Sequence, residues 1–293
     1  METYENILVV IEEQNFVTKA IDRAIKLAQR SHGKINILLL KNNATINHFV
    51  NLITLKRSNK LNSTLNGKSA VLLKLIEKLK VNGVNISNKL ITCNNYPAVL
   101  QEAADNRIDT VILAASGYDF WNTYQVNLID SYLIGHCPWP LLIIKEHEWE
   151  TEGNILSAIE ALSSKSEHIQ LTKKVLEETE HFSQLIGGSC HTLDCYVDEN
   201  INMYFEPSST KSSRDHHLSI MKKHCDNYHL SIEKVHLSLE LPESAITQLS
   251  TEIDPELIIL GDCGHRGLLN KFSVHVSEEV LKNIHCDLLI LKP

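Results

Sequence analysis

The chain has 293 residues, of which 43% are hydrophobic and 22% are charged, and its formal net charge is −8. This composition is typical of a folded protein long enough for two domains, and the acidic excess without a basic block argues against nucleic acid as a main partner. No apolar run reaches the roughly 18 residues of a membrane span and the N-terminus lacks the basic start of a signal peptide, so we expect no membrane association and a cytoplasmic location.

The first half of the chain alternates apolar runs with amphipathic stretches. The run at 7–11 predicts a buried strand, and apolar residues at helical spacing predict a helix at 16–31, with Gly33 placed to cap its C-terminus. The segment 41–68 is polar and insertion-like, with no predicted role. The other elements expected in this half are strands at 35–40, 86–92, 108–114 and 138–144, and helices at 70–80, from 96 onward and within 116–135.

The second half repeats this order. Asn6-Ile-Leu-Val-Val-Ile-Glu reappears as Asn154-Ile-Leu-Ser-Ala-Ile-Glu, 148 residues later, and Cys137 before a final apolar run reappears as Cys286. Such self-similarity predicts two copies of one domain, 1–150 and 151–293, joined in the charged stretch 147–153. The expected elements are strands at 154–160, 191–197, 230–237, 257–260 and 288–291, and helices at 170–186 (capped by Gly187), from 241 onward and at 276–284; the segment 198–214 is insertion-like.

Alternating strands and helices predict the fold class. Each domain should be an α/β unit with a five-stranded, mostly parallel, doubly wound sheet and helices on both faces. Ligands of such sheets bind beyond the carboxyl ends of the strands. The glycine turn Gly261-x-x-Gly264-x-x-Gly267 lies there, between the strand at 257–260 and the helix at 276–284, which makes it the first place to look for a site.

The cysteines do not indicate a metal or a disulfide framework. There are seven, an odd number, and none forms a Cys-x-x-Cys pair, so we expect most of them to be small core residues in a reducing compartment. Cys190 and His191 with the nearby Cys195 could suggest a metal. Adjacent strand residues point to opposite faces, however, and we predict no metal site.

Three stretches resemble the universal stress protein family, and in particular its tandem two-domain members of the E type. They are Asn6-Ile-Leu-Val-Val-Ile, the turn Gly261-x-x-Gly264-x-Arg266-Gly267, and the C-terminal Cys286-Asp-Leu-Leu-Ile-Leu-Lys-Pro. The likeness covers nearly the whole chain. It implies domains of the adenine nucleotide alpha hydrolase-like type, a cytoplasmic role in stress survival, and an intramolecular pseudo-dimer in which the domains pair through their last strands, ending at Ile144 and Leu291.

Nucleotide-binding members of this family carry Gly-x-x-Gly, nine residues, and then Gly followed by Ser or Thr, because glycines let backbone N–H groups approach phosphates. Here Gly261 and Gly264 match, but Val274 and His275 replace the later glycine and hydroxyl. A β-branched residue does not easily take a positive φ and fills space that a phosphate needs. Glu160 stands where an aspartate is expected, and the first domain has no comparable turn. We therefore expect no canonical ATP binding.

The candidate ligand site lies in the second domain. Both a ligand-binding role and a purely structural or solvent-exposed role are possible for some of its residues. Arg266 could bind a phosphate or face solvent, and His275 could contact a ligand, although capping a helix that begins near Ser277 is favoured. Val274 and Val276 make the mouth apolar, which allows an apolar ligand. The candidate residues are Ile159, Glu160, Gly261, Gly264, Arg266, Val274 and His275.

No catalytic motif stands out in the sequence. Gly-x-Ser-x-Gly, the Walker loop and His-Glu-x-x-His are all absent. We therefore predict a non-catalytic stress-response module with no cofactor and no metal, which holds a small or apolar ligand in the second domain. The expected partners are a second copy of the chain and a protein that the sequence does not identify. The alternative is an ATP-binding switch or weak ATPase that uses the Gly261-x-x-Gly264 turn.

Overall fold

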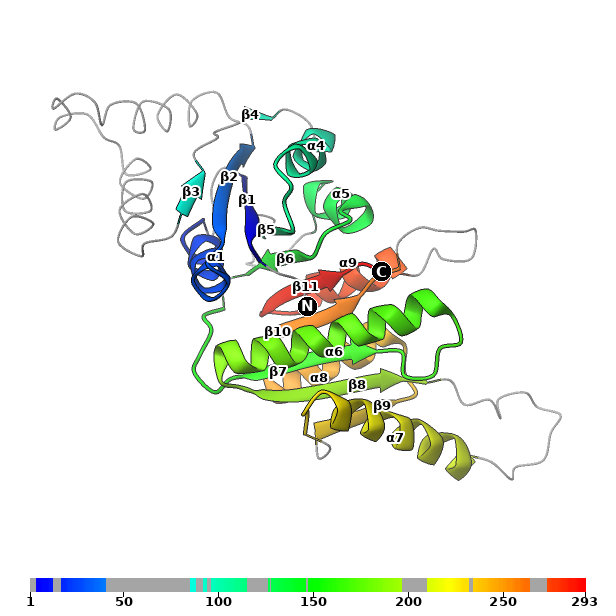
Figure 1. The fold of residues 1–293 in the computed structure, drawn as a ribbon. Helices are drawn as coiled ribbons and strands as arrows, with labels where there is room; N and C mark the ends of the chain where they lie inside the picture. The colour runs from blue at the N-terminus through cyan, green and yellow to red at the C-terminus, as the bar shows by residue number, and fades with distance from the viewer. Residues whose placement is uncertain are drawn as a thin grey trace, which may run out of the picture. The chain divides into compact units, whose positions relative to one another are not determined.

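The computed structural model describes residues 4–12, 17–40, 85–87, 92–93, 96–114, 126, 128–145, 147–196, 210–231, 234–263 and 273–293 (Figure 1). The chain divides into two compact units. The first unit comprises 2–116 and 139–145, and the second comprises 117–138 and 146–293. The domain limits 1–150 and 151–293 stay a prediction from the repeat. No described helix has the length and apolar character to cross a bilayer.

The first unit is built on a parallel sheet. Its described strands run in the order β3-β2-β1-β5-β6, each parallel to its neighbour, and β4 pairs with the end of β2. β1, β5 and β6 read as unbroken apolar runs because helices cover both faces, and their side chains are buried. The elements are β1 (Asn6–Glu12), α1 (Val17–Ser31), β2 (Lys34–Leu40), β3 (Asn85–Ser87), β4 (Thr92–Cys93), α4 (Pro97–Asp105), β5 (Thr110–Ala114) and β6 (Leu141–Ile144).

The end of α1 differs from the prediction. The left-handed residue is His32, with φ of 56°, rather than Gly33. Gly33 donates its N–H to the Ala28 carbonyl at 2.9 Å, and a Cβ at this position would lie 2.3 Å from the carbonyl oxygen of Tyr4. The glycine therefore permits a close approach to the N-terminal segment, while the cap conformation falls one residue earlier.

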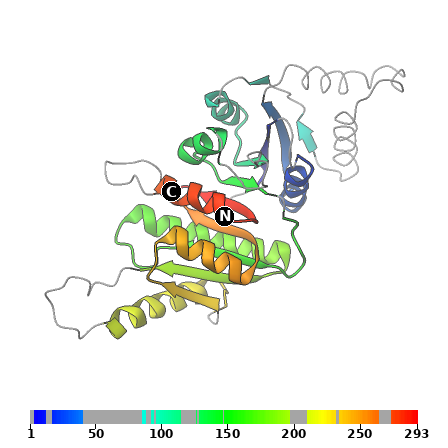
Figure 2. The ribbon, with the colours of Figure 1, turned by 180° about the vertical axis from the view of Figure 1, so that it is seen from behind.

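The second unit has the same plan. Its strands run in the order β11-β10-β7-β8-β9, each parallel to its neighbour. α6 and α7 cover one face of the sheet and α8 and α9 the other, as the two opposite views show (Figures 1 and 2). The elements are α5 (Leu128–His136), β7 (Asn154–Ile159), α6 (Ser166–Ile186), β8 (Ser189–Cys195), α7 (Thr210–Asn227), β9 (Val235–Ser238), α8 (Pro242–Ile253), β10 (Pro255–Gly261), α9 (Ser273–Asn283) and β11 (Asp287–Leu291).

The helix α6 is anchored at its C-terminal end. Gly187 takes the predicted left-handed cap, with φ of 76°, and its N–H bonds the Ser183 carbonyl at 2.8 Å. Gly188 then passes so close to Gly153 that a Cβ would lie 2.0 Å from the Gly153 carbonyl oxygen. Within the helix, Phe182 is fully buried and meets Trp149 edge-on at 5.8 Å. The strand that starts the second unit is thereby locked to α6.

The α/β fold class with mostly parallel sheets is confirmed, but some element limits were wrong. α7 was not predicted, and it begins inside the segment taken as an insertion. β9 begins at Val235 rather than at residue 230, because the chain is still in turns before it: the N–H groups of Leu230 and Lys234 bond the carbonyls of Cys225 and Ser231. The predicted strand at 86–92 is represented by the short β3 and β4. The predicted helix at 70–80, the segment 41–68 and residues 198–209 lie outside the described residues.

Candidate functional site

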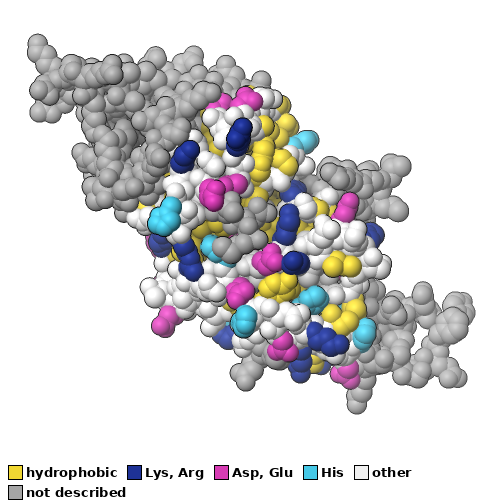
Figure 3. Space-filling view, in the orientation of Figure 1, with side chains coloured by type: hydrophobic (Ala, Val, Ile, Leu, Met, Phe, Trp, Pro, Cys, Tyr) yellow, Lys and Arg dark blue, Asp and Glu magenta, His cyan; other side chains and the backbone are white. Residues whose placement is uncertain are grey.

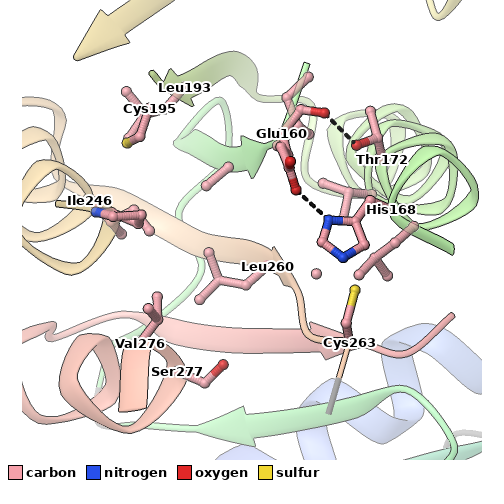
Figure 4. Close-up of a pocket in the computed structure, with 16 residues that line it drawn as sticks. Glu160, His168, Thr172, Leu193, Cys195, Ile246, Leu260, Cys263, Val276 and Ser277 are labelled. Carbon is pink, nitrogen blue, oxygen red and sulfur yellow. Dashed lines mark hydrogen bonds and ion pairs between the residues drawn. The ribbon is translucent and has the colours of Figure 1, made fainter. Parts of the chain in front are cut away.

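A cavity of about 470 Å³ opens at the carboxyl ends of β7, β8 and β10 in the second unit (Figure 4). This is the place where open parallel sheets bind ligands, and the volume is within the range of small-molecule sites. Side chains from the strand ends and from α6, α8 and α9 line it. Ile159, Glu160 and Gly261, three of the predicted site residues, are brought together here.

The interior of the cavity is apolar. Leu193 from β8 and Leu260 from β10 are 2% and 3% exposed, and Ile246 from α8 closes the space beside them. Val276 from α9 also lines the cavity, in agreement with the prediction that this valine makes the mouth apolar. These side chains are hydrophobic and held by the two helical layers, so the cavity offers a preformed apolar surface rather than a polar cradle.

Glu160 and His168 form the polar edge of the cavity. The Glu160 carboxylate bonds His168 Nδ1, and the two side chains are 56% and 21% exposed. Thr172 Oγ1 donates to the Glu160 carbonyl at 3.2 Å, so α6 holds both the backbone and the side chain of this residue (Figure 4). The acid predicted to face a nucleotide is therefore already engaged by a histidine.

Gly261 has a packing role. A Cβ at this position would lie 2.5 Å from Leu171 Cγ, so the glycine lets α6 approach the end of β10 closely. Its φ is not in the left-handed region. The glycine is thus explained by helix–strand contact, without a phosphate.

The two cysteines of the cavity, Cys195 and Cys263, remain thiols at neutral pH. Burial raises the pKa of Cys195 to about 12, with the carboxylates of Asp194, Glu240 and Glu243 adding to the effect. Burial also raises the pKa of Cys263, which again lies near acidic side chains. A nucleophilic cysteine needs a lowered pKa, so neither thiol is activated.

Ser277 lies in the cavity rather than at a helix start. α9 begins at Ser273, three residues before the predicted start at residue 276, so Ser277 lies inside the helix and the prediction of a helix start near Ser277 is wrong. The residue is 2% exposed and lines the cavity, with its hydroxyl on the cavity side of the helix (Figure 4). Sequence reasoning missed it because Ser-Glu-Glu is also a common first turn.

Two buried carboxylates, Asp194 and Asp262, brace the strand ends around the cavity. Asp194, 1% exposed, accepts from His217 Nδ1 at 2.6 Å and from the Ala161 N–H at 3.2 Å. Asp262, also 1% exposed, pairs with Lys292 Nζ at 2.9 Å, and Lys292 donates further to the Ile134 carbonyl at 2.7 Å. Both carboxylates are held by partners within the fold, so they act as structural braces.

The structure describes the other predicted site residues only in part. Val274 and His275 fall in the first turn of α9, with side chains outside the described residues, and Gly264 and Arg266 lie outside them entirely. Cys190 donates toward the Thr179 carbonyl on α6 at 3.7 Å, whereas its neighbour His191 bonds His236 of β9. The described part of the chain holds no cluster of three metal-ligating side chains.

Two successive parallel α/β units, with a cavity at the strand ends of the second, define a tandem doubly wound protein. The model of the universal stress protein family matches residues 3–145 and again 158–292, so the chain belongs to the universal stress protein family and carries its domain twice. Stress response is the role that this membership gives it.

Similar proteins cover the whole chain. It is 26% identical over 302 residues to universal stress protein E of Photorhabdus laumondii, with 100% of this chain and 96% of that protein aligned. Universal stress protein E of Escherichia coli K12 is 26% identical over 301 residues, with 100% and 95% aligned. A putative universal stress protein from Pseudomonas aeruginosa UCBPP-PA14 has the same fold, with a TM-score of 0.77 at 18% identity over 99% of this chain and 93% of that one. These relatives are named as stress proteins rather than as enzymes.

Proposed function

We propose that the chain is a non-catalytic stress-response module whose second domain holds a small apolar ligand in the 470 Å³ cavity. The observation that carries this proposal is the apolar interior formed by Leu193, Ile246 and Leu260, which is preformed and enclosed by helices on both faces of the sheet. A preformed apolar pocket with a few polar groups at its edge is what a small hydrophobic ligand requires.

Several features disfavour canonical ATP binding at this site. The Leu171 side chain fills the space beside Gly261, and the Glu160 carboxylate is hydrogen-bonded to His168. The sequence adds Val274 and His275 in place of the glycine and hydroxyl that nucleotide-binding members use. Together these features leave fewer free groups for a ribose or a phosphate.

The non-catalytic part of the proposal rests on the chemistry of the cavity side chains. Cys195 and Cys263 are protonated at neutral pH, and among the described contacts of the cavity wall His168 bonds Glu160, with no hydrogen bond between His168 and the Ser277 hydroxyl. An activated nucleophile requires an adjacent base or a lowered pKa. We propose that the protein acts in the cytoplasm through its surface, with the two halves paired and with a second copy or another protein as partner.

Binding of a neutral apolar dye, Nile red, tests the proposed function. The purified chain should bind it saturably, and Val276→Trp, which fills the cavity, should abolish binding. Ser244→Trp places the same residue on an exposed part of α8 that does not line the cavity, and should bind like the wild type. Calorimetric binding of ATP that displaces the dye would contradict the proposal and favour the nucleotide switch.

A further inference from the structure

The sheet of the second unit ends in an edge strand, β9. It is the last strand in the order β11-β10-β7-β8-β9, and no described element continues the sheet beyond it (Figures 1 and 2). All four residues of β9 are half-buried, whereas the interior strand β10 is buried from Pro255 to Leu260. The outer side of β9 is therefore uncovered by the part of the chain that the structure describes.

Backbone donors and acceptors face outward from this edge. The Ser238 carbonyl accepts a hydrogen bond from the Tyr196 N–H, at the end of β8, at 2.9 Å, so the polar groups of Ser238 face β8. Because these groups alternate in direction along a strand, those of His236 also face β8, while those of Val235 and Leu237 face outward. Neither Val235 nor Leu237 forms a hydrogen bond on the outer side with a described residue. An open row of this kind can pair with another strand.

β9 lacks three devices that commonly protect an open edge. Its four residues include no proline and no lysine, arginine or acidic residue, and its register with β8 has no bulge. Over the neighbouring helices α6 and α7, hydrophobic side chains reach the surface only in small groups among charged side chains and histidines (Figure 3). The strand edge is therefore a more distinct docking feature than this helical face.

The sequence around β9 is complementary to itself in the antiparallel orientation. The stretch that starts at Lys234 reads Lys-Val-His-Leu-Ser-Leu-Glu. When two copies of it run antiparallel about a twofold axis at Leu237, Val235 of each copy lies opposite Leu239 of the other. In the same register Lys234 of each copy lies opposite Glu240 of the other. Apolar residues thus meet apolar residues, and opposite charges meet at both ends.

The direction of the backbone groups fits this register. Residues that exchange two hydrogen bonds in an antiparallel pair must both face the partner strand, and Leu237, which faces outward, lies opposite itself. The chain bends after Ser238, so the contacts beyond the strand are made by side chains, among them Leu239, which is 60% exposed. A twofold axis at His236 would set Lys234 opposite Ser238, and the charge pairs would be lost.

We propose that a second copy of the chain docks on this edge, with β9 of each copy antiparallel to β9 of the other about Leu237. The sheets of the two second units then form one continuous sheet, and the Lys234–Glu240 pairs at both ends fix the register. The inference rests on the second copy that the proposed function names as a partner, and it adds the surface that binds that copy. It does not depend on the ligand of the cavity.

Charge reversal tests the register by sedimentation equilibrium of the full chain, which should form a reversible dimer. Lys234→Glu and Glu240→Lys each set like charges opposite each other and should weaken the dimer about tenfold. The double variant Lys234→Glu, Glu240→Lys restores opposite charges and should dimerise like the wild type, which excludes misfolding as the cause. Leu239→Lys should also weaken the dimer, whereas Leu162→Lys, at an exposed leucine after β7, should not.

Hydrogen exchange followed by mass spectrometry locates the interface. The peptide that carries Val235 and Leu237 should exchange more slowly in a concentrated sample than in a dilute one, because their outward N–H groups are bonded in the dimer. A monomer at every soluble concentration would overturn the proposal and leave the edge to an extended segment of a different protein. A dimer that leaves this peptide unprotected, or that the double variant does not restore, would also overturn it. In each case Nile red binding still reports separately on the cavity.

Discussion

Acidification should weaken the second unit through one histidine pair. His191 Nδ1 and His236 Nε2 lie 2.9 Å apart, their ring planes differ by 14°, and their centroids are 5.2 Å apart. That separation is close to the nitrogen–nitrogen distance plus two ring radii, so the nitrogens point at each other and share one proton between β8 and β9. A second proton would set two N–H groups face to face.

The sign and size of the effect follow from the pKa values. The pKa of His191 is lowered from 6.5 to about 4, mainly by burial and further by the neighbouring His236 and Lys234. Burial also lowers the pKa of His236, although Glu252 acts in the opposite direction. The unfolded chain therefore binds more protons below pH 6.5, and stability falls as the pH drops from 6.5 toward 4. At pH 5 His191 alone would cost about 2 kcal/mol, which partial exposure reduces to about 1 kcal/mol.

Urea unfolding at pH 7 and pH 5 measures this loss. The double variant His191→Gln, His236→Gln should lose about 1 kcal/mol less than the wild type between these two pH values. His285→Gln, which removes an exposed histidine from the same unit, should leave the pH dependence unchanged. An equal loss in the wild type and the double variant would refute the reasoning, because the pair would then not carry the pH dependence.

Two other features give direct predictions. Gly188→Ala places a Cβ 2.0 Å from the Gly153 carbonyl oxygen and should lower the free energy of unfolding by about 2 kcal/mol or more. Gly135→Ala in α5, where a Cβ would meet nothing within 4 Å, is the control and should be neutral or stabilising. Equal urea midpoints for the two variants would contradict the close approach of Gly188 to Gly153. Cys195 and Cys263 should react with iodoacetamide at pH 7.5 far more slowly in the folded chain than in the urea-unfolded chain, because their raised pKa values leave little thiolate. Peptide mass spectrometry measures the rate at each cysteine. Equal rates in the folded and unfolded chains would contradict the prediction.

The strands could be predicted from the sequence because burial on both faces requires continuous apolar runs. Leu257–Leu260 illustrates this, since it forms the centre of β10 and is buried throughout. α7 was missed because its sequence is mostly polar. Met221 and Cys225, four residues apart and fully buried, are the spacing signal that could have revealed it. The start of α9 was misplaced because Ser277 resembles a cap residue.

The site was only partly predictable for a similar reason. The Gly261 turn and Glu160 locate the end of the sheet, since both follow strands whose carboxyl ends lie together. The partner of Glu160 is His168, eight residues later on α6, and no motif links them. The Lys292–Asp262 pair joins residues that are 30 apart and becomes evident only when β10 and β11 are side by side.

Mass spectrometry of freshly purified chain, first under native conditions and then after release of small molecules, tests the apolar cavity most directly. The account predicts a substoichiometric or stoichiometric apolar compound that is lost in Val276→Trp and retained in Ser244→Trp. Stoichiometric ATP or ADP, present in the wild type and absent from Val276→Trp, would contradict it and assign the cavity to a nucleotide.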